Sequence, residues 1–231
     1  MQELLVNSTF FGVFLSLGVY LFGAWIQKKL KWPIFNPLLI CMAVIIPLLM
    51  ALDIPYEVYN SGAKMIGNFL TPVTVALAVP LYRQIKKLKE NLPAVLISIV
   101  CGCLGHALTI VLLSKVLGVE NIVRDSLMGK SVTTAIALGV TEELGGIAGV
   151  TIVGVVVAGI MGAVVGPTVL KIARVKEPVA FGLGMGASSH AIGTSKALEI
   201  GEVEGAMSSL SIVVTGVLTV ILVPIILGIA G

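Results

Sequence analysis

The sequence predicts an all-α polytopic membrane protein: a helical bundle with two oppositely oriented re-entrant hairpins, one broken helix and inverted repeats. Three observations support this prediction, namely the composition, the long apolar segments and a weak internal repeat. The chain is 57% hydrophobic and 12% charged, with a mean hydropathy of +1.08. A soluble globule of 231 residues cannot bury so much apolar surface. The 26 glycines and the few aromatic residues suit closely packed helices better than a lipid-facing β-barrel.

Long apolar segments predict the helices that cross the bilayer. A helix needs about 20 apolar residues to cross the hydrocarbon core. The first such segment lacks the basic region and the cleavage pattern of a signal peptide, so we expect it to remain as a membrane helix. The five segments of sufficient length are residues 4–27, 33–52, 92–117, 147–170 and 205–229.

Basic clusters set the expected orientation. Ten of the 15 Lys and Arg residues lie in three short clusters, at residues 28–31, 83–89 and 171–176. Cytoplasmic loops carry an excess of Lys and Arg, so the clusters are placed in the cytoplasm and the N-terminus outside. Binding to nucleic acid is not expected, because each cluster flanks an apolar span and has no accompanying motif.

Three segments are too polar or too interrupted to be ordinary lipid-facing helices: residues 58–82, 127–145 and 178–200. The helix expected between the last two already connects the two sides of the membrane. Segment 127–145 must therefore leave and return on the outer side, and segment 178–200 on the cytoplasmic side. Segment 58–82 can cross once, with a break near residues 70–72, because Pro72 lacks a backbone donor and restricts the residue before it.

An internal repeat agrees with this arrangement. Residues 131–172 resemble residues 188–229 at a shift of 57 positions, and each copy has a short Ser/Thr/Gly-rich part followed by a long apolar part. Many transporters consist of two such repeats in opposite orientations, with interrupted helices that meet at the substrate site. The expected organisation is an N-terminal transmembrane helix at 1–32, a first membrane half at 33–120, and hairpin-plus-helix repeats within 121–231, at about 127–173 and 178–229.

The interrupted segments also predict a binding site. Non-helical backbone at membrane depth persists only where protein shields it or where it faces a wet cavity. The N-terminus of a half-helix has free N–H groups and a positive dipole end, so it favours an anion such as a carboxylate. The candidate substrate-binding residues are Thr71, Thr74, Lys130, Ser131, Thr133, Thr134, Ser188, Ser189, His190 and Thr194.

Several candidates have a structural alternative. Ser131 could simply cap a helix, and Lys130 could extend to the outer interface. His190 could donate to a substrate carboxylate or relay a proton, or it could be hydrogen-bonded within the hairpin turn. His106 lies midway along an apolar span, and we interpret it as a structural residue bonded to a neighbouring helix.

The sequence favours no enzyme, metal or cofactor. No His/Cys/carboxylate cluster has the spacing of metal ligands, and neither G-x-S-x-G nor H-E-x-x-H occurs. The glycines of residues 182–186 follow G-x-G-x-G, which fits no nucleotide-binding loop. The three cysteines lie in apolar runs and are interpreted as packing residues.

Four blocks of sequence resemble the LrgB/CidB family, in the right order and over roughly residues 33–229. They are residues 36–40, 75–82, 130–137 and 187–194. The resemblance implies a bacterial plasma-membrane protein with a small LrgA/CidA-type, holin-like membrane partner. It also implies either antiholin-like modulation of murein hydrolase activity and autolysis, or the carboxylate export and pyruvate handling described for plastid and bacterial relatives. The family often has proline where this chain has Met128-Gly129 and Ala135, which leaves the hairpin turn and the substrate preference open.

Two functional hypotheses follow. The first is a secondary transporter of small monocarboxylates such as pyruvate or glycolate, a homo-oligomer in the lipid bilayer that works with the LrgA/CidA-type partner. The second is an antiholin-like regulator of murein hydrolase activity and autolysis that acts by protein interaction. Because unsatisfied backbone groups in hydrocarbon cost several kcal/mol each, interrupted segments favour a functional site and hence the transporter.

Overall fold

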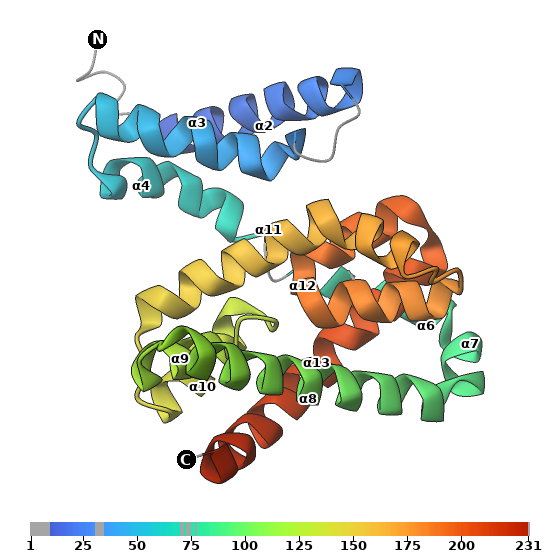
Figure 1. Ribbon diagram of the computed structural model, residues 1–231. Helices are drawn as coiled ribbons and strands as arrows, with labels where there is room; N and C mark the ends of the chain where they lie inside the picture. Colours follow the sequence, from blue (N-terminus) through green and yellow to red (C-terminus); the bar gives the residue numbers. More distant parts are fainter. Residues whose placement is uncertain (1–9, 31–34, 70–71, 73–74, 77, 231) are drawn as a thin grey trace. The chain divides into compact units, whose positions relative to one another are not determined.

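The computed structural model describes residues 10–30, 35–69, 72, 75–76 and 78–230. Every regular element in these residues is a helix (Figure 1), as the sequence predicts. The chain divides into two compact units, residues 1–76 and 77–231, which we describe separately.

The N-terminal unit contains α2 (Phe11–Leu30), α3 (Pro37–Ala51) and α4 (Tyr56–Gly67). Asn36 starts α3, because its side-chain oxygen accepts a hydrogen bond from the backbone N–H of Leu38 at 2.9 Å. Helices α2 and α4 approach closely at Gly12, where an added Cβ would lie 2.0 Å from the Tyr59 carbonyl oxygen. One turn further on, the Ser16 and Tyr59 hydroxyls hydrogen-bond at 2.7 Å.

The C-terminal unit consists of eight described helices. Its last three, α11, α12 and α13, are long and follow one another through short connections, with α12 packed against both of the others. Helix α13 also crosses α8 (Figure 1). The eight helices are α6 (Ala78–Arg83), α7 (Ile85–Glu90), α8 (Leu92–Leu117), α9 (Asn121–Leu127), α10 (Thr134–Glu143), α11 (Ala148–Ile172), α12 (Pro178–Ile200) and α13 (Glu202–Ala230).

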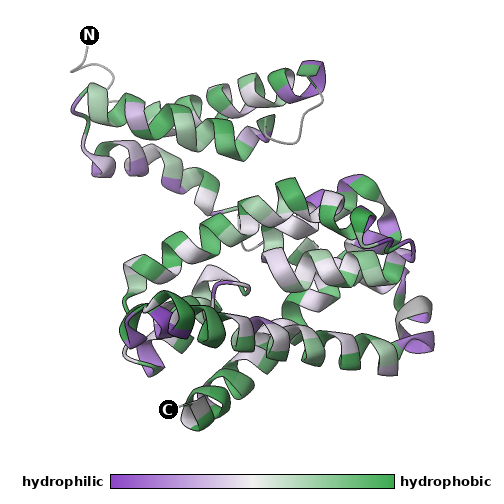
Figure 2. Ribbon diagram, viewed as in Figure 1, coloured by the Kyte–Doolittle hydropathy of each residue, from purple (hydrophilic) through white to green (hydrophobic). Residues whose placement is uncertain are grey.

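Among the residues that the structure describes, four helices have the length and composition to cross a membrane: α2, α8, α11 and α13. They correspond to four of the five predicted spans, and Figure 2 shows their largely hydrophobic ribbons, with hydrophilic residues gathered at connections. The fifth predicted span contains α3, which has 15 residues. At 1.5 Å per residue α3 is about 22 Å long, shorter than the hydrocarbon core of about 30 Å.

The core between α8, α12 and α13 contains small residues at close contacts. A buried cluster includes Ile99 and Cys103 from α8, Leu183 from α12 and Met207 from α13. Beside it, a Cβ added to Gly186 of α12 would lie 2.3 Å from the Ser208 carbonyl oxygen in α13. Only glycine therefore permits this separation of the two backbones.

A buried hydroxyl network fixes the connections among α9, α10 and α11. The Thr151 hydroxyl donates to the Ser126 carbonyl at 2.9 Å and lies 2.7 Å from the Thr141 hydroxyl. The Ser126 hydroxyl accepts from the Ile147 N–H at 2.7 Å. These bonds satisfy polar groups that would otherwise be buried without partners.

Two of the three segments expected to be interrupted show an interruption in the described residues. Residues 128–133 separate α9 from α10, and α12 contains one residue with non-helical dihedral angles, His190 (φ 41°, ψ −136°). In the N-terminal unit α4 ends at Gly67, and the predicted break at residues 70–72 falls largely outside the described residues.

Candidate functional site

The connection of residues 128–133 is a compact turn. The N–H of Lys130 donates to the Leu127 carbonyl at 3.1 Å, and that of Val132 donates to the Gly129 carbonyl at 3.1 Å. A Cβ on Gly129 would lie 2.9 Å from the Cα of Ala137, so the turn folds directly against α10. We call residues 128–133 the α9–α10 turn.

His106 of α8 holds this turn from the other side. Its Nε2 lies 3.1 Å from the Met128 carbonyl oxygen, and its Nδ1 lies 3.3 Å from the Ser131 Oγ. A carbonyl can only accept, so Nε2 carries a proton; in the neutral ring Nδ1 then accepts from the Ser131 hydroxyl. Both ring nitrogens are therefore engaged by the α9–α10 turn.

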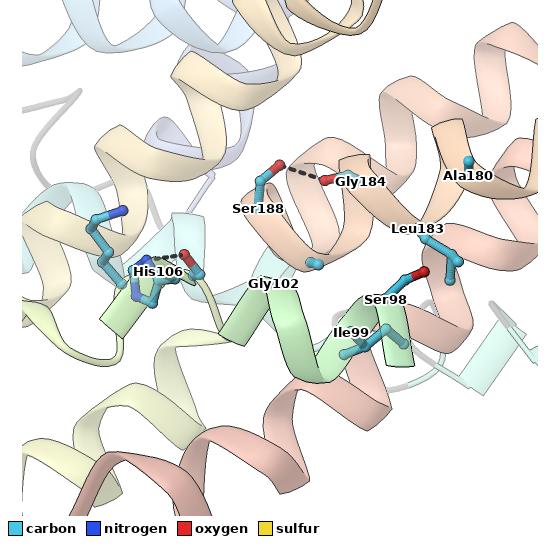
Figure 3. A pocket seen from close by; sticks show the side chains of 11 residues that line it. Ser98, Ile99, Gly102, His106, Ala180, Leu183, Gly184 and Ser188 are labelled. Carbon is cyan, nitrogen blue, oxygen red and sulfur yellow. Dashed lines mark hydrogen bonds between the residues drawn. The ribbon is translucent and has the colours of Figure 1, made fainter. Parts of the chain in front are cut away.

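A pocket of about 390 Å³ lies between α8, the α9–α10 turn and α12 (Figure 3). Its volume falls at the lower end of the roughly 300–1,000 Å³ typical of small-molecule sites. Ile99 and Leu183 contribute apolar wall, and hydroxyls and backbone contribute polar surface. The lining residues are Ser98, Ile99, Gly102 and His106 from α8, Lys130 and Ser131 from the turn, and Ala180, Leu183, Gly184, Ala187 and Ser188 from α12.

The electrostatics of the pocket favour an anion. Lys130 is the one charged side chain among these lining residues, and no carboxylate is among them. Burial lowers the pKa of Lys130 from its usual range, because the ammonium form loses water contacts. A bound anion would give the half-buried ammonium of Lys130 the oppositely charged partner that the pocket wall does not provide.

The pocket brings together three of the candidate residues from sequence: Lys130, Ser131 and Ser188. The Ser188 hydroxyl donates to the Gly184 carbonyl at 2.7 Å (Figure 3). Thr133 and Thr134 lie at the start of α10 and do not line the pocket.

Three further candidates lie at helix contacts instead. The Ser189 side chain packs on α11 at Gly162, where an added Cβ would lie 1.5 Å from its Oγ. The Thr194 hydroxyl donates to the His190 carbonyl at 3.0 Å and lies 2.7 Å from the Ser208 hydroxyl of α13. None of Ser189, His190 and Thr194 lines the pocket.

The break at His190 is held by α11. The Nε2 of His190 donates to the Val155 carbonyl at 3.0 Å, and the ring rests on Gly159, whose added Cβ would lie 2.7 Å from it. The backbone angles of His190 are sparsely populated for any residue with a side chain. The imidazole of His190 thus bonds to the neighbouring helix α11. The structural alternative considered from the sequence was a bond within the hairpin turn of His190 itself.

Thr71 and Thr74 lie outside the described residues. The residues that sequence reasoning missed are those of α8: Ser98, Gly102 and His106. Their spacing of four places them on one face of a helix, a signal that could have been found in the sequence.

No group of three His, Cys, Asp or Glu side chains that could hold a metal occurs among the residues described. The pocket has hydroxyl, imidazole and ammonium groups without a carboxylate or thiol. This donor set suits a small anion better than a metal ion.

Comparison with known proteins identifies the family. The model of the LrgB-like family matches residues 16–229. The chain belongs to this family. It is 37% identical over 223 residues to the antiholin-like protein LrgB of Bacillus cereus (strain B4264) and to that of Bacillus anthracis (strain CDC 684 / NRRL 3495), covering 96% of the chain and 97% of each relative. No solved structure matches it.

Family membership and the four apolar helices make this chain a multi-pass membrane protein. The names of the relatives favour the antiholin-like hypothesis over the transporter that the sequence ranks first.

Proposed function

We propose that this LrgB-like protein acts as an antiholin-like regulator that restrains a holin-like membrane partner and so limits murein hydrolase activity and autolysis. The observation that supports this most strongly is the 37% identity, along 96% of the chain, to relatives named antiholin-like protein LrgB. An LrgA/CidA-type protein is the partner that this function requires. The proposal assigns no enzymatic activity to the chain.

The proposal can be tested in a bacterium that lacks its own LrgB-like gene. Expression of the chain together with an LrgA/CidA-type partner should slow autolysis and weaken murein hydrolase bands in a zymogram. The two proteins should also purify together from membranes. Unchanged autolysis, with the protein present in the membrane, would contradict the proposal.

The pocket supports a second candidate function, transport of a small monocarboxylate. Lys130, Ser131 and His106 all line a cavity that has no acidic lining residue. The share of liquid volume taken by one water is about 30 Å³, so the pocket has room for a three-carbon acid and several waters. Pyruvate and glycolate are the acids to test.

The transport proposal includes the finer architecture expected from sequence, namely two hairpins that enter from opposite faces and belong to inverted repeats. The shift of 57 residues superimposes Thr133, the non-helical residue before α10, on His190, the non-helical residue within α12. It also superimposes Pro167 on Pro224, and each proline lies inside a long helix. Matching breaks at matching positions support a repeat of one structural unit.

The two functions predict different effects of one substitution. If the protein transports an anion, Lys130→Gln should reduce pyruvate uptake into proteoliposomes by about tenfold or more, because a hydrogen bond to a charged group contributes about 1.5–3 kcal/mol. Lys176→Gln, in the exposed connection after α11, is the matched control and should transport normally. A regulator that acts through its surfaces should restrain autolysis equally well with either substitution.

We further propose that the protein lies in the bacterial plasma membrane, that its N-terminus is outside the cell and that it forms a homo-oligomer. Single cysteines at positions 130 and 190, labelled from each side of intact cells, test the orientation of the two interrupted segments. Labelling of both positions from the same side would contradict opposed hairpins. Cross-linking in membranes tests the homo-oligomer.

A further inference from the structure

We propose that His106 is the proton-coupling residue of the pocket: a carboxylate that binds beside Lys130 is accompanied by protonation of His106, with the Ser131 hydroxyl as the link between the two. This inference rests on the anion-binding function proposed above and names a residue that the sequence interpretation treated as structural.

The hydrogen bonds of His106 define what protonation changes. Nε2 donates to the Met128 carbonyl in either charge state, because that carbonyl has no proton to give. The Nδ1 atom is therefore where a proton can be gained. In the neutral ring Nδ1 must accept, and the Ser131 hydroxyl at 3.3 Å is its donor.

The single hydroxyl proton of Ser131 has two competing uses. In the neutral state it is committed to His106, so the oxygen presents lone pairs to the pocket and repels an anion. When a proton from water binds Nδ1, the imidazolium donates to the Ser131 oxygen, and the hydroxyl proton is free to donate into the pocket. A carboxylate would then meet a hydroxyl donor, an imidazolium and the ammonium of Lys130.

The side chains described around His106 include no free carboxylate that could balance the positive charge of a protonated ring. The incoming anion is therefore the group that balances this charge. Lys130 is the charged side chain that acts on the ring. The adjoining helix turns of α8 pack against apolar residues from α10 and α13, such as Val140 and Val223. In α9, Arg124 and Asp125 are paired with each other at 2.7 Å. The lining residues of α12 carry no titratable side chain.

Linkage fixes the sign of the effect. The complex holds one more proton than the free protein and free anion, so affinity for the anion must fall as pH rises. The dissociation constant should increase by up to about tenfold per pH unit across about pH 5–8, as long as His106 is neutral in the free protein and protonated in the complex. The same coupling would make carboxylate movement through the protein an uptake of one proton with each anion.

Isothermal titration calorimetry with pyruvate tests the proposal directly. Titrations of the purified protein in lipid nanodiscs, in phosphate and in Tris at one pH, give the number of protons taken up per anion bound. We expect uptake approaching about one proton for the wild type in this range. Under the proposal, His106→Gln binds pyruvate more weakly and takes up no proton.

Lys130→Arg identifies which group is protonated, because arginine keeps its charge throughout the range. This variant should retain the proton uptake of the wild type. Loss of the uptake in Lys130→Arg would place the proton on Lys130 and overturn the inference. The measurement on Lys130→Arg does not depend on His106→Gln, so it still tests the proposal if His106→Gln does not fold.

Nitrogen NMR provides a second, independent measurement. The chain has two histidines, so selective ¹⁵N labelling gives two imidazoles. On addition of pyruvate one ring should change from the neutral form protonated at Nε2 to the imidazolium, while His190, bonded to Val155 outside the pocket, stays unchanged.

The binding experiments distinguish a failure of the anion-binding function from a failure of the role proposed for His106. If the wild type binds neither pyruvate nor glycolate, the anion-binding function itself is wrong, and the inference falls with it. If the wild type binds pyruvate with equal affinity across the pH range and without proton uptake, the pocket is an anion site and only the role of His106 is overturned.

Discussion

Substitution of Gly186 by alanine tests the packing on which the pocket depends. An added Cβ would lie 2.3 Å from the Ser208 carbonyl oxygen and 2.9 Å from the Ser208 Cα and C atoms. All three contacts are with backbone, so no side chain can move aside and the two helices must separate until the contact exceeds 3.0 Å. Overpacking of this kind costs about 1–3 kcal/mol. For a chain of this size each kcal/mol lowers the melting temperature by about 2–4 °C, so we expect a decrease of roughly 2–12 °C.

The assay can report on this contact specifically. Cys103 is buried between α8, α12 and α13, whereas Cys41 is half-buried and Cys101 is exposed. With Cys41 and Cys101 replaced by serine, a thiol-reactive dye reports the temperature at which this core opens.

Gly105→Ala in α8 is the matched control, because its added Cβ would have no atom within 4 Å apart from its chain neighbours and the nearby backbone of α8 itself. It should melt at the wild-type temperature or slightly higher, since alanine favours a helix. If Gly186→Ala and Gly105→Ala melt at the same temperature, α12 and α13 do not pack as closely as described.

Three further predictions use the same proteins. Thr151→Val removes the bonds to Thr141 and to the Ser126 carbonyl and should cost about 1–3 kcal/mol in thermal unfolding; a cost near zero would show that the hydroxyl network is not stabilising. His190→Gly should be more stable than His190→Ala by about 1–3 kcal/mol, the reverse of helix propensity, because glycine relieves the backbone strain at φ 41°; the normal order would refute the strained angle. Burial lowers the pKa of Lys130, so its charge is lost as pH rises through a lower pKa than that of an ordinary lysine; pyruvate affinity should fall in alkaline buffer, and Lys130→Arg should remove that alkaline loss.

The spans and the interruptions could be predicted from sequence because each depends on local chemistry. Hydropathy over about 20 residues identifies a helix in contact with lipid, whatever its neighbours are. The interruption before α10 was expected from the run of small and hydroxyl residues that begins at Gly129, and α10 starts at Thr134. The fifth span is the exception, because the described helix α3 covers only 15 residues of it.

The pocket could be predicted only in part, because side-chain type does not reveal which helix faces which. Lys130, Ser131 and Ser188 stood out as polar residues in interrupted segments. His106 looked isolated in an apolar span, although Ser98 and Gly102 precede it on the same helical face. Its partner Met128 contributes a backbone carbonyl, which every residue has.

The same limit explains His190. Its ring bonds to the carbonyl of Val155, an apolar residue in the middle of a span that gives no sign of being an acceptor. The sequence also does not single out Gly159 as the residue that packs against the ring, because 26 glycines are spread along the chain. Interhelical contacts through backbone atoms are therefore visible only once the helices are placed.

The glycines of α12 illustrate how one periodic pattern serves two purposes. Residues four apart share one face of a helix, whereas residues two apart point in widely different directions. Gly182 and Gly186 accordingly both face the backbone of α13, with added Cβ atoms 2.3 Å from the Glu204 and Ser208 carbonyl oxygens, while Gly184 between them lines the pocket. The G-x-G-x-G pattern that fits no nucleotide loop thus belongs to a helix that packs tightly on α13 on one side and contributes Gly184 to the pocket wall on another, where an added Cβ would lie 3.3 Å from the Leu170 side chain. Because Gly184 lies between the two contacts with α13, a change in how closely α12 approaches α13 would also move this wall of the pocket.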